Sequence, residues 1–140
     1  PNEIIDSGVV AKASLEKEGG EAFACALIEA YYEVNKALAD SAKRNETLIA
    51  IGEKFSNLDL EQMEKVVEQT QFYGTPDEGL AVLTGTELPK IMDTVVSFCT
   101  AHGIVEKAPV LGYGDAAKAP DADVRFDPTY IRKVSQGPAK

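Results

Sequence analysis

The chain has 140 residues, of which 44% are apolar and 26% charged, and its formal net charge is −9. The composition is typical of a globular protein, and the length fits one domain with a real core. The acidic excess argues against nucleic acid and anionic membranes as partners, because Lys and Arg supply most of the affinity for phosphates. Residues 1–105 hold 18 acidic and 8 basic side chains, whereas residues 106–140 hold 5 and 6. The acidity therefore belongs to the first part of the chain.

The first half of the chain predicts one strand followed by helices. Residues 3–11 are rich in β-branched side chains, which favours a short strand, and Gly8 within it suggests a bulge or a close backbone approach. A helix is expected over residues 21–40, with Tyr32 at the surface and an apolar stripe at helical spacing made of Ala24, Leu27, Ile28, Tyr31, Val34 and Leu38. A second helix is expected over 42–55. The pair Asp59 and Gln62 has the spacing of a capping box and predicts a third helix that ends near residue 71.

The sequence of the second half predicts further helices and one irregular segment between them. A short helix is expected over 77–84. Residues 87–102 show the clearest helical period, with an inward apolar stripe made of Leu88, Ile91, Met92, Val95, Cys99 and His102. Residues 108–123 are rich in Ala, Gly, Pro and Asp and predict an irregular segment, and residues 124–126 a strand stub. Asp127 as N-cap and Pro128 at the first helical position predict a final short helix.

The pattern of one short strand followed by five or six helices leaves that strand without a neighbour, and a strand needs one to pair its backbone N–H and C=O groups. Its partner strand is expected either across a dimer interface or in sequence beyond this chain. We therefore interpret the sequence as a mostly helical fragment of an α/β fold. Residues 1–105 form its strand and helical body, and residues 106–140 form an irregular tail with a short C-terminal helix.

Neither the cysteines nor the single histidine match a metal or redox motif. Cys25 and Cys99 are far apart in the sequence, and both are expected to be buried free thiols, with one disulfide as the alternative. His102 follows Cys99 at helical spacing, which permits a Cys–His pair. We reject that pair as catalytic, because both residues belong to the stripe predicted to pack inward and no third orienting group lies near. No catalytic residue, metal ligand or cofactor is predicted, and the chain is not expected to be an enzyme.

Four stretches carry a resemblance to a known family. They are Pro1-Asn2-Glu3-Ile4-Ile5-Asp6 with Val9-Val10-Ala11, Leu27-Ile28-Glu29-Ala30-Tyr31-Tyr32, Phe72-Tyr73, and Val124-Arg125-Phe126-Asp127-Pro128-Thr129-Tyr130. Together they resemble the C-terminal part of the periplasmic substrate-binding proteins of ABC transporters. The most similar branch handles nitrate, taurine and other sulfonates, and includes members assigned to urea transport. The match extends to about Val134 and covers only the later part of such a protein.

The resemblance implies a fold, a location and partners. In that family two α/β lobes close on a solute by a hinge motion, and the transporter recognises the closed form. The chain would then be part of the second lobe of a type II binding protein, located in the periplasm, with a small solute and an ABC transporter permease as partners. Pro1 would be a processed or internal start, and the chain would supply at best one wall of the binding cleft. We expect little or no solute binding by these 140 residues alone.

Four residues are candidates for solute contact. Glu3 and Asp6 lie on the opening strand, and their carboxylates would suit a ligand with several N–H donors, such as urea or guanidine. Phe72 and Tyr73 would supply a flat apolar wall and one hydroxyl. The alternative interpretations are solvated edge-strand charges for the first pair and core packing for the second. The chain has three arginines, Arg44, Arg125 and Arg132, which mildly favours a neutral or cationic nitrogen compound over nitrate or taurine.

A different class of function stays open beside solute binding. The chain could be a stand-alone helical domain that self-associates without a ligand. In that case the exposed strand and the two-sided helix 21–40 would mediate a homodimer, with the strand paired across the two-fold axis.

Overall fold

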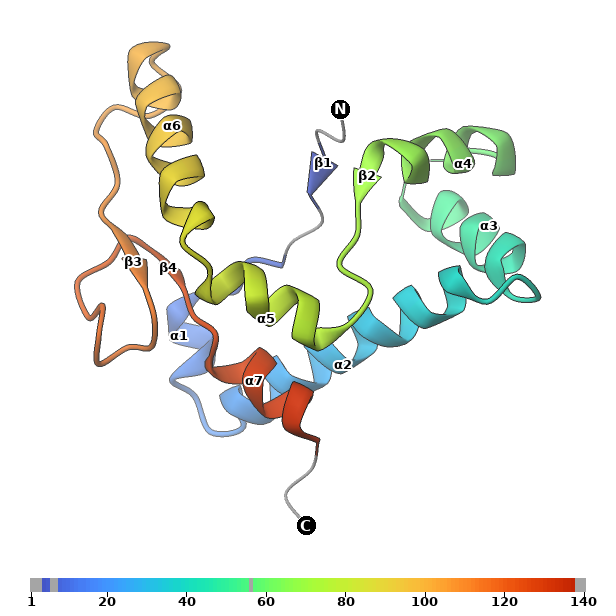
Figure 1. Ribbon diagram of the computed structural model, residues 1–140, viewed down its shortest axis with the longest axis horizontal. Helices are drawn as coiled ribbons and strands as arrows, with labels where there is room; N and C mark the ends of the chain where they lie inside the picture. Colours follow the sequence, from blue (N-terminus) through green and yellow to red (C-terminus); the bar gives the residue numbers. More distant parts are fainter. Residues whose placement is uncertain (1–3, 6–7, 56, 138–140) are drawn as a thin grey trace. The chain divides into compact units, whose positions relative to one another are not determined.

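The structure is a computed structural model that describes residues 4–5, 8–55 and 57–137. It divides into two compact units, Pro1–Thr75 and Pro76–Lys140. The first unit contains β1 (Ile4–Ile5), α1 (Lys12–Leu15), α2 (Gly20–Ala39), α3 (Arg44–Phe55), α4 (Leu60–Gln69) and β2 (Thr70–Gln71). The second contains α5 (Pro76–Thr84), α6 (Glu87–Ala101), β3 (Leu111–Tyr113), β4 (Val124–Phe126) and α7 (Thr129–Gln136) (Figure 1).

The described chain is mostly helical, with two sheets of two parallel strands each. This composition is compatible with a fragment of an α/β fold. It differs from the predicted single strand with five or six helices, since seven helices and four short strands are described. The division at residue 105, drawn from charge and composition, stays a prediction.

The opening strand has a partner within the chain. β1 pairs in parallel with β2, with Ile4 opposite Thr70 and Ile5 opposite Gln71 (Figure 1). Parallel strands need a long crossover connection, and α1 to α4 provide it here. The expectation of a partner strand outside the chain is therefore wrong, because residues 70–71 leave the helix that their sequence appeared to continue. Gly8 has no atom within 4 Å of a Cβ built on it, so a close backbone approach at this position is also wrong.

The core of the first unit lies where three helices meet. Leu38 of α2, Leu48 of α3 and Met63 of α4 form a buried cluster, and Leu48 is fully buried. The predicted capping box starts α4: the Asp59 carboxylate accepts from the Gln62 amide at 2.9 Å, and the Gln62 side chain accepts from the Asp59 amide at 3.0 Å. A Cβ on Gly52 would stand 2.4 Å from the Leu58 carbonyl oxygen, so only glycine allows the Leu58 backbone to lie this close to α3.

Helix α2 is confirmed, and its buried face matches the predicted one only in part, at Ala24 and Leu38. Ala24, Tyr32, Asn35 and Leu38 are buried, whereas Tyr31 is half-buried and Leu27 and Val34 are exposed. The placement of Tyr32 at the surface is therefore wrong. A prediction that uses only apolar residues cannot include Asn35, and this polar residue shifts the buried face around the helix.

Helix α6 is also confirmed, but only part of its predicted inward stripe is covered: Leu88, Met92 and Cys99 are half-buried, whereas Ile91, Val95 and His102 are exposed. None of its residues is fully buried, and Ile91, Val95 and Phe98 are exposed on one face. Its more covered residues are Leu88, Pro89, Met92, Val96 and Cys99, all half-buried. Helical periodicity identified the helix correctly, but the predicted stripe is turned partly away from the side that the rest of the unit covers.

The segment predicted as irregular contains a strand. β3 lies within residues 108–123 and pairs in parallel with β4, the predicted strand stub, with Gly112 opposite Arg125. Asp123 holds the start of this pair, since its carboxylate accepts from the Val110 amide at 2.7 Å and its own amide donates to the Val110 carbonyl at 2.8 Å. α7 begins at Thr129, one residue later than predicted, and the Asp127 carboxylate accepts from the Thr129 amide at 2.9 Å, as expected of a residue that caps a helix start.

In the second unit, α7 packs against α5, and Ile131 is the buried residue of α7. The Ser135 hydroxyl donates to the Asp77 carboxylate and joins the end of α7 to the start of α5. Within the described residues, no helix is long and apolar enough to span a membrane.

Candidate functional site

The four predicted solute-contacting residues are only partly described by the structure. Glu3 and Asp6 lie outside the described residues, so their predicted role stays a prediction. Phe72 and Tyr73 directly follow the carboxyl end of β2 and are both half-buried. This position is of interest because ligands of open α/β sheets bind outside the carboxyl ends of parallel strands.

The two aromatic side chains differ in their surroundings. Phe72 packs against the cluster of Leu38, Leu48 and Met63, so at least part of its ring serves the core. The backbone of Tyr73 is fixed by a side chain from another element: the amide of Asn35 donates to the Tyr73 carbonyl oxygen at 3.1 Å. Of the pair, Tyr73 is the better candidate for solute contact.

Asn35 is a positioning residue that the sequence analysis did not select. It lies on the buried face of α2 and is 7% exposed. Burying an amide is costly unless it is hydrogen-bonded, so its bond to Tyr73 both satisfies the amide and fixes the segment that follows β2. An Asn among the apolar positions of a helix was the signal in the sequence that could have identified it.

The pair of Cys99 and His102 is not inside a core. Neither Cys25 nor Cys99 forms a disulfide bond, as predicted, but both are half-buried rather than buried. His102 is exposed at the end of α6, where its Nδ1 lies 2.9 Å from the Phe98 carbonyl oxygen and its ring stacks on Phe98 at 4.0 Å. The inward position used to argue against catalysis is therefore wrong, and the ring nitrogen nearest the helix is already engaged by the backbone.

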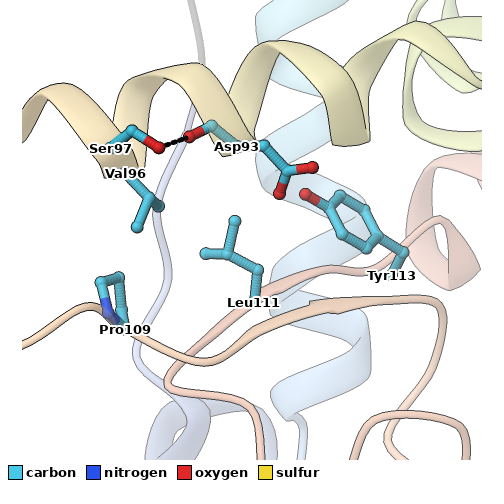
Figure 2. A pocket seen from close by; sticks show the side chains of 6 residues that line it. All are labelled: Asp93, Val96, Ser97, Pro109, Leu111 and Tyr113. Atoms are coloured by element: carbon cyan, nitrogen blue, oxygen red, sulfur yellow. Dashed lines mark hydrogen bonds between the residues drawn. The ribbon is translucent and has the colours of Figure 1, made fainter.

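A cavity of about 430 Å³ lies within the second unit, between α6 and β3. The helix supplies Asp93 together with Val96 and Ser97, which follow it by three and four residues. The strand supplies Leu111 and Tyr113, which are two residues apart and so point to the same side, and Pro109 precedes them (Figure 2). The sequence analysis selected none of these six residues as a site.

The polar groups of this cavity are a carboxylate and a phenol. Figure 2 shows the Asp93 carboxylate and the Tyr113 hydroxyl directed toward one another. The hydroxyl is buried, and it has no hydrogen-bond partner among the described residues. Burial, and secondarily the negative charge of Asp93, raise the pKa of Tyr113 above its ordinary value of 10.0. The phenol is therefore neutral at physiological pH.

The stacking of Tyr113 fixes the orientation of this phenol. Its ring lies nearly parallel to that of Phe126, with the ring centroids 5.4 Å apart. The Gly114 amide donates to the Phe126 carbonyl at 3.0 Å and extends the pairing of β3 with β4 past Tyr113. On the helical side, the Ser97 hydroxyl donates to the Asp93 carbonyl oxygen at 2.7 Å, so it is directed along the helix rather than into the cavity (Figure 2).

Within the described residues, no three His, Cys, Asp or Glu side chains are grouped so as to hold a metal ion. Comparison with protein families, with curated proteins and with solved structures finds no match to this chain. The resemblance to binding proteins of ABC transporters therefore stays a prediction from the sequence.

Proposed function

We propose that the chain is a solute-binding component of an ABC importer, or a piece of one, for a small solute such as urea, guanidine, taurine or nitrate. The proposal rests on the four resembling stretches together with one observation from the fold. That observation is the parallel pair of β1 and β2, followed at the carboxyl end of β2 by Phe72 and Tyr73. Binding at such an edge requires no catalysis by the chain, and location in the periplasm and contact with a permease belong to the same proposal.

The chemistry of the first unit favours a nitrogen compound over an anion within this proposal. Arg44 already has a structural hydrogen bond, because its guanidinium donates to the Leu38 carbonyl oxygen at 3.0 Å. In the second unit, Arg125 forms an ion pair with Asp127 at 3.4 Å, and both side chains are largely covered. Two of the three arginines are thus engaged, whereas a Tyr hydroxyl and strand carbonyls are groups that accept hydrogen bonds from urea or guanidine.

The proposal is tested by thermal shift with urea, guanidine, taurine and nitrate on the protein produced from its complete reading frame. We expect one solute to raise the melting temperature. The variant Tyr73→Phe, which removes only a hydroxyl, should reduce that shift, whereas Tyr130→Phe on α7 should not. Absence of stabilisation by all four solutes would contradict the proposal.

The 140 residues by themselves provide a second, separate measurement. Because both lobes contribute contacts in the resembling family, we expect little or no binding of these solutes by this chain in calorimetry. Micromolar binding would show that the chain holds a complete site, and would contradict its role as one wall of a cleft.

Self-association is the second candidate, and exposed apolar residues favour it. They form one face of α6 (Ile91, Val95 and Phe98) and one of α2 (Phe23, Leu27 and Val34). Contiguous apolar surface of this kind is typical of contact sites. Pairing of β1 across a two-fold axis is no longer needed to complete its sheet, since β2 already pairs with it.

Light scattering at increasing concentration tests this alternative. A dimer that is disrupted by Val95→Glu but not by Val34→Glu would assign the contact to α6, and the opposite result would assign it to α2. A chain that stays monomeric at high concentration would exclude self-association.

A further inference from the structure

We propose that the cavity between α6 and β3 is a binding site for a small organic cation, an alkylammonium or amidinium group on a short apolar body. This site lies in the second unit and is independent of Phe72 and Tyr73. Its polar end is formed by Asp93 and Tyr113, and its apolar wall by Val96, Pro109 and Leu111.

The charge of the lining determines the sign of the ligand. Asp93 is the only charged residue of the six, and among the described residues its carboxylate has no ion pair. Neither Lys nor Arg lines the cavity, so an anion would meet the Asp93 carboxylate without compensation. A cation with N–H donors is the class of ligand that complements this charge.

The Tyr113 hydroxyl adds a second acceptor for such a cation. It faces Asp93 without forming a direct hydrogen bond, so a cation with two or more N–H bonds can donate one to each of the two oxygens (Figure 2). Leaving a buried hydroxyl unpaired is unfavourable, and a bound donor removes that cost. Asp93 is an exposed residue, and because exposed side chains change rotamer readily, its carboxylate can turn to admit the ligand.

The apolar wall selects the rest of the ligand. Val96 and Leu111 present branched aliphatic side chains from opposite sides of the cavity, and Pro109 lies beside them (Figure 2). A volume of about 430 Å³ falls within the range of pockets that hold small organic molecules. A cation with a short alkyl chain therefore fits better than a bare ammonium ion, because its chain can cover the wall.

Titration of the full chain with n-butylamine tests the site, with n-butanol and butyrate as neutral and anionic probes of the same length. We expect butylamine alone to bind and to shift the methyl NMR resonances of Val96 and Leu111. Equal binding of butanol, or butylamine shifts elsewhere in the chain only, would overturn the proposal.

Three variants separate the two polar groups from a general effect of charge. Asp93→Asn should weaken butylamine binding by about tenfold or more, and Tyr113→Phe by about threefold to tenfold, as expected for a charged and a neutral hydrogen bond. Asp121→Asn removes an equal charge from an exposed position outside the cavity and should leave binding unchanged. Unchanged affinity in folded Asp93→Asn, as judged by circular dichroism, would overturn the proposal, as would no detectable binding by the unaltered chain.

Discussion

The two units of the molecule are stabilised in different ways. The first has helices that meet in an apolar cluster, with Leu48 fully buried at its centre. The longest helix of the second, α6, has no buried residue, and Ile131 on α7 is the buried apolar side chain of that unit among the described residues. Both α3 and α6 were predicted as helices, α6 with the clearer helical period, yet among the described residues only α3 contributes to a buried cluster. Periodicity therefore predicts that a helix forms and not how deeply it packs.

The second unit relies more on small residues and polar contacts of the backbone. Gly112 of β3 is buried against Ala119 and Ala122, and Asp115 accepts from the amides of Ala117 and Lys118 at 3.1 and 3.0 Å. These contacts order residues whose composition is typical of a loop. The difference between the units can be tested by removing one contact from each.

The largest effect is expected for Leu48→Ala in the core of the first unit. Leu48 is 0% exposed, and truncating a buried Leu costs about 2–5 kcal/mol in the free energy of unfolding. Ile49→Ala is the matched control, because the neighbouring side chain is 42% exposed and should cost less than about 1 kcal/mol. Urea unfolding followed by circular dichroism measures both, and equal costs would contradict the assignment of the core.

In the second unit, Gly112→Ala should be the most damaging small change. The added Cβ would lie 2.5 Å from the Cβ of Ala119 and 2.6 Å from that of Ala122. Overpacking of this kind costs about 1–3 kcal/mol in the free energy of unfolding. Gly8→Ala is the control, since no atom lies within 4 Å of the new Cβ. If Gly112→Ala unfolds at the same urea concentration as the unaltered chain, residues 114–123 do not pack on β3 in solution.

Features of this fold could be predicted from the sequence when the interacting residues are close to one another along the chain. The helices and the capping box of Asp59 and Gln62 were predictable, because their signals lie within a few residues of one another. The pairing of β1 with β2 was not predictable, because the two strands have only two residues each and lie far apart in the sequence. In addition, residues 70–71 continue an apparent helix in the sequence. β3 was missed for a related reason: Leu111 to Tyr113 lie among residues typical of loops.

The candidate sites show the same limit. Phe72 and Tyr73 were recognisable as an aromatic step after a helix, and the structure adds that they follow a strand end. Asn35 could be identified only by asking why an amide lies on a buried helical face. Asp93 and Tyr113 belong to no motif, and they meet because one face of α6 and one face of β3 line the same open cavity.

The two units also differ in how their helices begin. This difference can be tested with one substitution in each unit, with a smaller expected effect on stability. α4 has a capping box, whereas Thr86 at the start of α6 makes no side-chain capping bond. Asp59→Ala should cost about 0.5–2 kcal/mol, and Thr86→Ala should have almost no effect on the free energy of unfolding. Urea unfolding measures both variants. If Thr86→Ala lowers the free energy of unfolding as much as Asp59→Ala does, the two helix starts do not differ in capping in solution.

The smallest expected effect is in the titration of Tyr113. Its pKa is raised from 10.0 by burial and by Asp93, so the folded chain favours the neutral phenol. The resulting stability is fully present below pH 10 and is lost as the pH rises through the higher pKa of the folded state. Among the residues that line the cavity, Asp93 is the charged group that faces Tyr113.

Asp93→Asn therefore should lower the pKa of Tyr113 part of the way toward 10.0, because the charge is removed while the larger cause, burial, remains. Asp121→Asn should leave this pKa unchanged. NMR of the carbon bonded to the phenol oxygen resolves Tyr113 from the other tyrosines and follows its ionisation directly. An unchanged pKa in Asp93→Asn would mean that α6 does not hold its carboxylate against β3, and the second unit would then be more loosely packed than its cavity indicates.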